Sequence, residues 1–460
     1  MSVATPRPEY VKAYRNWHRT RCALEGRSEV LDNISDFLPT TQGQRENPDM
    51  YRIFSERATW YGGAAKTLDA WVGVLTRKPL TVDVPSGYKA RLDDIDGDGT
   101  DINSFVQKVV RNVLAYGRYG ILVDVSGSRD HRDPNTVPYF SGYNAQTIKS
   151  WRMRKTSKVR VLDQVILEES SEFQHESGFG VSTQTVYRVL ELDEKERYRI
   201  RVFTGVDGGF AESDPIYPTI ANYNMDFIPF VFCGPTSTSP TIEKAPLQDV
   251  VDANFAHFLS SADFHWSLFW SASPTVVVTG MSPDDTTPIQ VGGGSFIKLP
   301  SGATASYLES QGPGLTMLQA SMSDKQQHMA TLGASLLSAP KREVETAEAL
   351  TIKSNGESAS LVTVADVVGK ALTKCLKMAC DWEGYKGKVS AALNRDLVSV
   401  RLTPKEMDGL VMMHQAGLLS DEDFFWNLQQ GEILRPGVSI EDAVSIMSLR
   451  SGTQSLPRDE

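Results

Sequence analysis

The sequence contains few cysteines and no pattern typical of a metal or disulfide framework. Its four cysteines among 460 residues form no C-x-x-C pair. Cys375 and Cys380 are five residues apart, so on a helix their side chains point in different directions. Cys22 and Cys233 have no cysteine near them in the sequence. Isolated thiols of this kind are usually small buried side chains, and we expect neither a structural zinc site nor a disulfide scaffold.

Long apolar runs are also missing. No segment approaches the roughly 20 apolar residues that a membrane-spanning helix needs. The first residues, MSVATPRPEYVKAYRNWHRT, lack the apolar core of a secretory signal. We therefore expect a chain that is cytosolic when made and has no membrane partner. A hydrophobic content of 40% with 23% charged residues is typical of a soluble globular protein.

Patterns that mark common enzymes are absent as well. There is no G-x-x-x-x-G-K-[ST] loop, no G-x-G-x-x-G between a strand and a helix, no G-x-S-x-G elbow and no H-E-x-x-H. The glycines of VGGGS, residues 291–295, lead into a strand-like FIKL and fit a tight turn. His257 and His265 are eight residues apart on one predicted helix, too far to share a metal ion simply. We expect no ATP hydrolysis, no cofactor and no enzymatic chemistry.

Positive charge is scarce relative to negative charge. The formal net charge is −10 at pH 7. A protein that holds DNA by its phosphates needs a concentrated basic surface. Any contact with DNA is therefore expected to be loose, or to depend on a few local cations.

One acidic stretch is similar to a calcium-binding loop. DIDGDG places Asp94, Asp96 and Asp98 at positions one, three and five of such a loop. The last position requires a bidentate glutamate, but Phe105 stands there. We favour an acidic surface loop that leads to Asp101 as the N-cap of a helix. Weak calcium binding by the three aspartates remains an alternative.

Hydrophobic periodicity predicts a chain of the α+β class. Strand patterns dominate residues 139–232, and a helix from Asp101 should end at Gly117 or Gly120. Asn355-Gly356 is expected to bend or interrupt the last long helix. Further helices are expected at 9–25, 49–77, 247–270, 314–337 and 344–382, and short helices at 403–449. A strand is expected at 80–84, and a β-rich insert between the helices 247–270 and 314–337.

Aromatic residues surround the predicted helix 247–270. A helix that is apolar on several sides must be buried on several sides. If the helix projects from a domain, other copies of the chain are the natural cover, which predicts an oligomer with a stem of packed helices. The candidate subunit-contact residues are Phe255, Phe258, Trp266 and Phe269.

The order of these elements resembles the portal protein of tailed bacteriophages over most of the chain, from about residue 10 to 437. The motifs that carry the resemblance are LAYGRYGILVDV, FIPFVFCGP followed by PLQDVVDANFAHFLSSADFHW, and LGASLL followed by ETAEALTIKSNGESASLVTVADVV. The sequences of these motifs are similar to those of a branch of portal proteins known mainly as a family of uncharacterised domains.

The resemblance implies a portal fold with named segments. The α/β wing would comprise 1–244, the outgoing stem helix 245–271, the clip 272–312, the returning stem helix 313–337, the tunnel loop 338–345, the long wing helix 346–395, and the crown with its tail 396–460. It also implies a ring of about twelve subunits at one capsid vertex, in the host cytoplasm during assembly and then in the virion. The implied partners are double-stranded DNA, the terminase large subunit, head-completion adaptor and tail proteins, and the major capsid and scaffolding proteins.

The predicted tunnel loop is short and charged. Continuation of the helix is disfavoured by Pro340 and by the small residues before it, which include Ser338. The same residues keep the turn narrow. Lys341 and Arg342 are candidates to face DNA phosphates, and Glu343 to pair with cations or repel DNA. A solvated loop with no DNA contact is the alternative reading.

The function predicted from the sequence is that of a passive portal subunit, which passes, retains and releases double-stranded DNA. Two alternatives remain. One is another virion structural protein without a channel, and the other is a calcium-dependent enzyme that uses Asp94, Asp96 and Asp98.

Overall fold

The computed structural model describes most of the chain, in two units that we treat separately. The units are Met1–Arg395 and Asp396–Glu460. The described residues are 2–125, 137–155, 160–174, 180–206, 208–220, 223–272, 275–280, 299, 302–308, 313–334, 347–395, 404–430, 433 and 442–446. Helices and strands alternate irregularly, and the predicted α+β class is confirmed.

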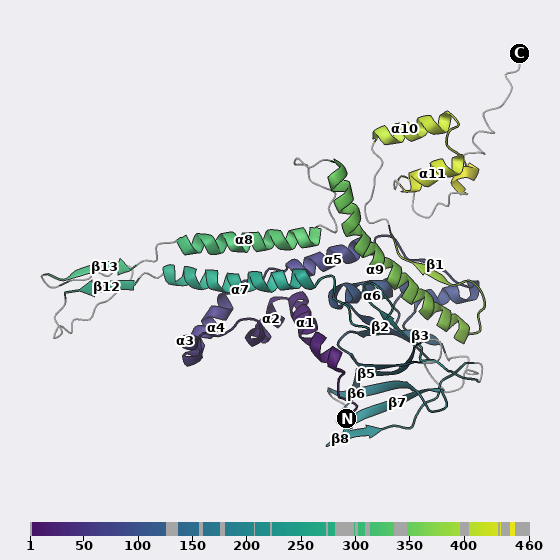
Figure 1. Ribbon diagram of the computed structural model, residues 1–460, viewed down its shortest axis with the longest axis horizontal. Coiled ribbons are helices and arrows are strands. Elements are labelled where there is room, and N and C mark those ends of the chain that lie inside the picture. Colours follow the sequence, from purple (N-terminus) through teal and green to yellow (C-terminus); the bar gives the residue numbers. More distant parts are fainter. Residues whose placement is uncertain are drawn as a thin grey trace, which may run out of the picture. The chain divides into compact units, whose positions relative to one another are not determined.

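The first unit begins with a group of helices (Figure 1). They are α1 (Pro8–Glu25), α2 (Arg27–Asp32), the 3-10 helix η1 (Ile34–Asp36), α3 (Gln42–Glu46), α4 (Pro48–Arg57) and α5 (Gly63–Leu75). The single helix expected at 49–77 is wrong, because residues 58–62 leave the helical conformation between α4 and α5. In that break the ring of Trp60 packs against Phe255 and Phe258 at centroid distances of 5.2 and 5.5 Å. Tertiary packing thus outweighs the local helical pattern.

Helix α6 (Ile102–Tyr116) has both of its predicted ends. The Asp101 side chain accepts a hydrogen bond from the Asn103 N–H at 3.0 Å, which caps the first turn. Gly117 ends the helix in the left-handed region, with φ of 68°. The chain then enters β2 (Tyr119–Val125) directly.

Two antiparallel sheets form the β part of the unit. The first has the order β11-β2-β3, and the second the order β4-β5-β6-β7-β8. Their remaining strands are β3 (Pro138–Asn144), β11 (Phe230–Cys233), β4 (Ile148–Lys155), β5 (Arg160–Gln174), β6 (Val181–Leu192), β7 (Tyr198–Val206) and β8 (Gly209–Glu212). Smaller pairs join β1 (Thr81–Asp83) to β14 (Ser390–Ala392) and β9 (Thr219–Ile220) to β10 (Tyr223–Asn224), and the 3-10 helix η2 covers Ser86–Asp93.

The two sheets meet around a buried arginine. The guanidinium of Arg118 lies 3.7 Å from the ring centre of Trp151 in β4 and 4.8 Å from that of Phe232 in β11. Burial, together with the charge of Arg7, lowers the pKa of Arg118 to about 9. Cation–π contacts replace part of the hydration that the guanidinium gives up there.

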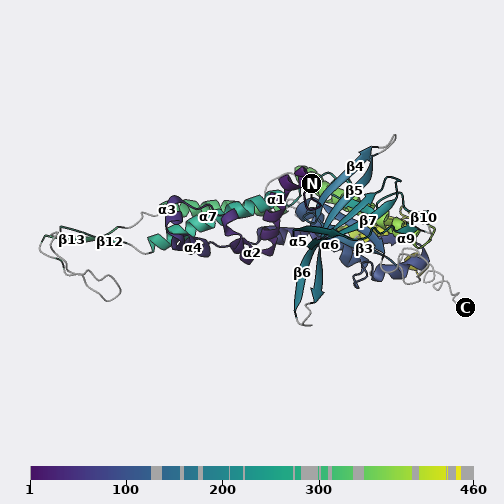
Figure 2. The same cartoon turned by 90° about the horizontal axis from the view of Figure 1, so that it is seen from below.

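Two long helices run side by side as an arm, as Figures 1 and 2 both show. They are α7 (Gln248–Ser271) and α8 (Pro313–Ala334), and the paired strands β12 (Thr275–Thr279) and β13 (Thr304–Leu308) lie between them in the sequence. No helix among the described residues is both long enough and apolar enough to cross a bilayer.

Helix α9 (Ala347–Trp382) packs against β2, β3 and β11. It continues through Asn355 and Gly356, so of the bend or interruption expected there, the interruption does not occur. A glycine costs a helix about 1 kcal/mol relative to alanine. The buried stripe of Leu361, Val368 and Leu372 anchors the following turns to the sheet, and this packing outweighs that cost.

The second unit contains two described helices, α10 (Pro404–Gln415) and α11 (Asp421–Gln430). Gly417 has a φ of 72° after the first helix, and Ser420 accepts a hydrogen bond from the Asp423 N–H at 3.1 Å before the second. His414 stacks on Phe424 and lies 2.7 Å from an Asp421 oxygen, which ties the two helices together.

Gly117 permits the first testable prediction. A Cβ added there would lie 2.5 Å from the Glu243 carbonyl oxygen, in addition to the positive φ. We expect Gly117→Ala to lower the free energy of unfolding by about 2 kcal/mol or more, since the left-handed conformation alone costs roughly 1–2 kcal/mol. Urea denaturation measures this. Gly43→Ala is the matched control, because nothing lies within 4 Å of its Cβ position; equal stability of the two variants would contradict the prediction.

Candidate assembly surface on helices α7 and α8

A line of polar side chains holds the two helices of the arm together. The Gln326 side-chain amide donates to Nε2 of His257 at 3.0 Å. Nζ of Lys325 donates to the hydroxyl oxygens of Ser260, at 2.8 Å, and Ser321, at 2.7 Å. Directional bonds of this kind fix the register of two helices more strictly than apolar contact does. Burial and the Lys325 charge hold the pKa of the His257 imidazole below its ordinary value, which favours the neutral ring as an acceptor.

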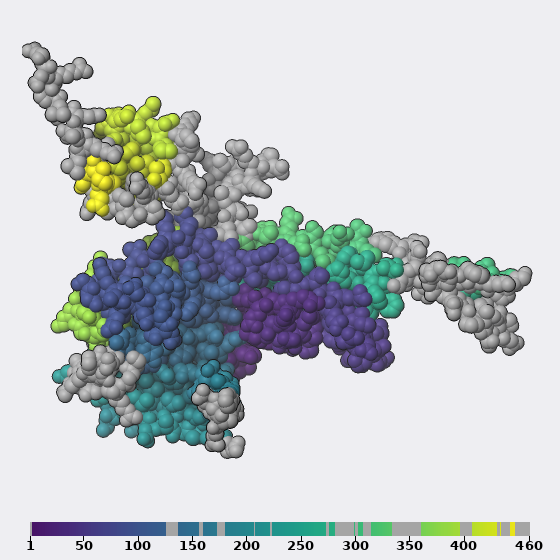
Figure 3. Space-filling view, turned by 180° about the vertical axis from the view of Figure 1, so that it is seen from behind, coloured from purple at the N-terminus to yellow at the C-terminus, as the bar shows by residue number. Residues whose placement is uncertain are grey.

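The first half of α7 is anchored to the N-terminal helices. Oδ1 of Asn254 accepts a hydrogen bond from the Ala64 N–H at 3.0 Å, at the start of α5. The Ser261 hydroxyl accepts from the Thr59 N–H at 3.0 Å and donates to the Thr59 carbonyl at 2.9 Å. Figure 3 shows the N-terminal helices, in purple, lying against the arm. One half of α7 is therefore fixed by its own chain.

This anchoring corrects the prediction for Phe255 and Phe258. Phe255 stacks on Phe37 at 4.3 Å and also contacts Trp60, while Phe258 contacts Trp60. The two phenylalanines are 7% and 1% exposed. They belong to the core of the unit, and the same chain provides the cover that we expected from other copies. The sequence did not reveal this, because Trp60 was placed inside a continuous helix.

The second half of α7 is less covered. Trp266 packs edge-on against Phe54 at 5.8 Å, and the Arg57 guanidinium lies 3.9 Å from the ring centre of Phe269. Both aromatic side chains remain half-buried. Their role in subunit contact stays a prediction.

Exposed apolar residues on this half were not singled out by the sequence reading. Leu268 is 43% exposed and Trp270 is 51% exposed. On α8, Met317 is 74% exposed. In the sequence, the spacing of Leu268, Trp270 and Met317 along their helices is the same as that of buried residues, so it did not show that they are exposed. Large exposed side chains that share one pair of helices mark a surface suited to contact with another protein chain.

The predicted calcium ligands hold their own loop instead of converging. Oδ1 of Asp94 accepts from the N–H groups of Gly97 and Gly99, each at 2.9 Å. Oδ1 of Asp96 accepts from Asp98 and Thr100, at 3.1 and 3.0 Å. Desolvation alone would raise the pKa of Asp96. The hydrogen bonds that its ionised form accepts outweigh this effect, and the pKa is lowered. Among the described residues no group of three or more His, Cys, Asp or Glu side chains is arranged to hold a metal ion.

The predicted tunnel-loop residues lie outside the described part of the chain. They are Ser338, Lys341, Arg342 and Glu343. Their DNA-facing role remains a prediction.

Comparison with known proteins identifies a match to one family model. Residues 246–383 match a domain of unknown function, DUF4055. The matched segment includes α7, β12, β13, α8 and α9, and it agrees with the resemblance to an uncharacterised-domain family. No curated protein matches the chain.

Two solved structures are similar to the chain at low identity. One is the neck of an empty GTA particle computed with C6 symmetry, with a TM-score of 0.42 and 12% identity over 77% of this chain and 86% of that one. The other is the neck of a native GTA particle computed with C12 symmetry, with a TM-score of 0.43 and 13% identity over 80% of this chain and 89% of that one.

The core position of Phe258 generates the second prediction. We expect Phe258→Ala to lower the free energy of unfolding by about 3–5 kcal/mol, because it removes a fully buried ring and leaves a cavity. Trp270→Ala, at a half-exposed position, should change it by less than about 1 kcal/mol. Chemical denaturation of dilute protein measures both. Similar values for the two variants would show that Phe258 is not part of the chain's own core.

Proposed function

We propose that this chain is a structural protein of a tailed-phage particle, and specifically the portal subunit at its head-to-tail vertex. The observation that carries the proposal is the arm: a helix leaves the α/β body, a β insert follows, and a second helix returns beside the first before a 36-residue helix packs on the body. This is the succession of stem, clip and wing helix that the resemblance implies.

The exposed end of the arm supports assembly into a ring. Thr59, Trp60 and Ala64 anchor α7 between Asn254 and Ser261. Leu268 and Trp270 nearer its end, and Met317 of α8, are exposed. Identical arms placed around an axis would cover these residues with their neighbours. When one surface of a chain contacts a different surface of the next copy, a closed ring forms if the rotation between copies closes after a whole number of subunits.

The channel role completes the proposal. Lys341 and Arg342, repeated around a ring, would form a cationic belt, while the net charge of −10 would keep DNA from adhering elsewhere. The ring would dock the terminase large subunit during packaging, and adaptor and tail proteins afterwards, with no chemistry of its own. Its contacts with capsid and scaffolding proteins would place it at a single vertex.

Imaging of the purified chain tests this function. We expect symmetric rings with a central opening in negative stain. Leu268→Glu combined with Trp270→Glu should abolish the rings without changing the circular dichroism spectrum, since buried like charges would repel between neighbours. Tyr223→Glu, at an exposed aromatic in β10, is the control that keeps the rings. A wild-type chain that stays monomeric, or forms assemblies without a hole, would refute the portal assignment.

The cationic belt has a test of its own. We expect the double variant Lys341→Ala, Arg342→Ala to form normal rings but to retain less packaged DNA, because two phosphate contacts per subunit are lost. The measurement is nuclease-protected DNA per particle. Lys195→Ala, in an exposed turn, controls for general loss of charge. Unchanged retention in the double variant would show that these cations are incidental.

A further inference from the structure

A groove of about 390 Å³ lies in the first unit, away from the arm. Its lining includes three consecutive residues of β11, namely Phe230, Val231 and Phe232. One stripe of α9 provides a wall, and the spacing of its residues by three and four places them on a single helix face. These residues are Lys374, Lys377, Met378 and Asp381.

The groove runs along the main chain of β11. Successive side chains of a strand point to opposite faces, so a cavity that touches three in a row must follow the strand's edge. The strand β11 is the outer strand of its sheet, paired on one side only, with β2. The opposite side of the groove is formed by Met153 of β4 and Leu162 of β5, which belong to the other sheet.

The pairing with β2 shows which main-chain groups face the groove. The Pro229 carbonyl accepts a hydrogen bond from the Val123 N–H at 2.9 Å. Because the pattern alternates along an antiparallel pair, Val231 also faces β2, while Phe230 and Phe232 direct their main-chain groups outward. The Phe230 N–H is bonded to the Ile228 carbonyl at 2.8 Å. Within the described residues no main-chain bond reaches the N–H or the carbonyl of Phe232 from the groove side.

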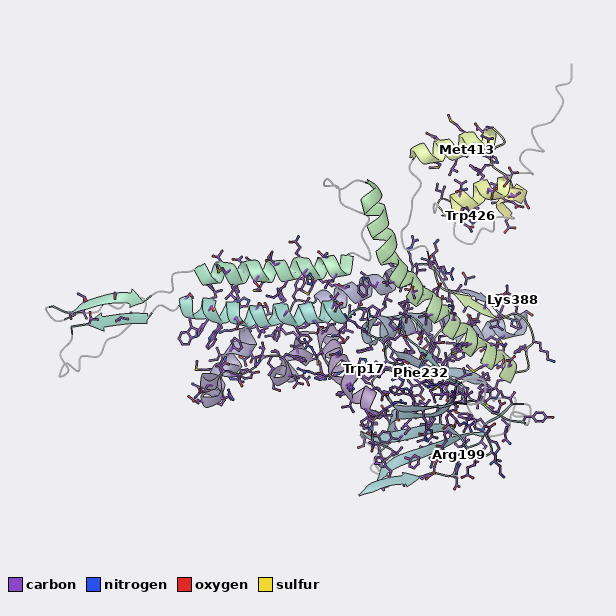
Figure 4. All side chains as sticks on the ribbon, viewed as in Figure 1. Trp17, Arg199, Phe232, Lys388, Met413 and Trp426 are labelled. Atoms are coloured by element: carbon purple, nitrogen blue, oxygen red, sulfur yellow. The ribbon has the colours of Figure 1, made fainter. Side chains whose placement is uncertain are left out.

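An unpaired strand edge in an apolar groove fits an extended peptide. A buried main-chain donor or acceptor without a partner costs about 1–3 kcal/mol, and Phe232, labelled in Figure 4, is a buried residue. An added strand would satisfy its N–H and carbonyl together, and the apolar lining would receive alternate side chains of that strand. Volumes of this size accommodate a few side chains or a small ligand.

The charges at the rim indicate what the peptide carries. Nζ of Lys374 donates to the Thr238 hydroxyl at 2.9 Å, and Lys377 is exposed. Neither lysine forms an ion pair with a described carboxylate. Two lysines against the single Asp381 leave the rim positive, which favours a peptide carboxylate at this end.

We propose that this groove binds an extended segment of a partner protein by strand addition to β11, with an apolar side chain in the groove and a carboxylate beside Lys374 and Lys377. The site does not depend on ring formation or on a channel. It would give the chain a second docking surface, distinct from the exposed half of the arm.

A labelled peptide tests the proposal on the full chain. The probe is a fluorescein-labelled synthetic peptide of two glutamates followed by three Val-Thr repeats, and fluorescence anisotropy measures its binding. We expect saturable binding that weakens about tenfold in the double variant Lys374→Glu, Lys377→Glu, because two attractive charge pairs become repulsive. Lys388→Glu is the matched control, since Lys388 lies 3.3 Å from Asp83 outside the groove.

Two further comparisons separate strand addition from general charge attraction. A peptide with proline in place of each threonine lacks the main-chain N–H at every second residue of the repeats and is poorly suited to a paired strand, so we expect it to bind more weakly. Met378→Trp fills the groove while keeping its charges, and it should prevent binding. Circular dichroism confirms that each variant is folded.

Several outcomes would overturn the proposal. Absence of wild-type binding at millimolar peptide, or equal binding of the proline peptide, would exclude strand addition. Self-association of the chain that is lost in the double variant would show that a second copy occupies the groove instead. The two peptide outcomes do not involve ring formation, so failure there is distinguishable from failure of the portal assignment.

Discussion

The structure depends on how residues 58–62 meet helix α7. Thr59 exchanges two hydrogen bonds with the Ser261 side chain, and Trp60 packs against Phe255 and Phe258. This contact joins the N-terminal helices to the arm, and it sets where the arm begins to project. Since α8 is held to α7 through Gln326 and Lys325, the position of both helices follows from the same contact.

The same helix is therefore a core helix at one end and a candidate assembly helix at the other. In the first half of α7 the Asn254 side-chain oxygen bonds to the start of α5, and the rings of Phe255 and Phe258 are covered by the same chain. Towards the end of α7, Trp266 and Phe269 are partly covered by Phe54 and Arg57, and Trp270 remains half exposed. Segments with few buried apolar contacts have low local stability. Contact with neighbouring copies would thus stabilise the end of the arm more than its base, which couples assembly to local order.

Local chemistry made a large part of the fold predictable. The cap at Asp101 and the stop at Gly117 depend only on the residues of one helix and its ends. The sequence located Asp101, and it gave Gly117 as one of two possible stops, with Gly120 as the other. The long helices and the β-rich region were found because their hydrophobic periods are extended. The break at 58–62 was missed because Trp60 packs against Phe258, which is distant in the sequence. For the candidate site, the sequence did not show which aromatic residues of α7 the chain itself would cover.

The molecule has two candidate binding surfaces, and each suits a different kind of partner segment. The end of the arm offers exposed apolar side chains on two helices, and such a surface suits another helix of the same kind. The groove beside β11 offers an unpaired strand edge at Phe232 with positive charge at Lys374 and Lys377, and such a surface suits an extended acidic segment. Helix packing depends on shape over a large area, whereas strand addition depends on main-chain bonds and tolerates varied sequences. A ring subunit with both surfaces could keep permanent contacts with its copies through the arm and exchange other partners at the groove, because neither contact uses residues of the other.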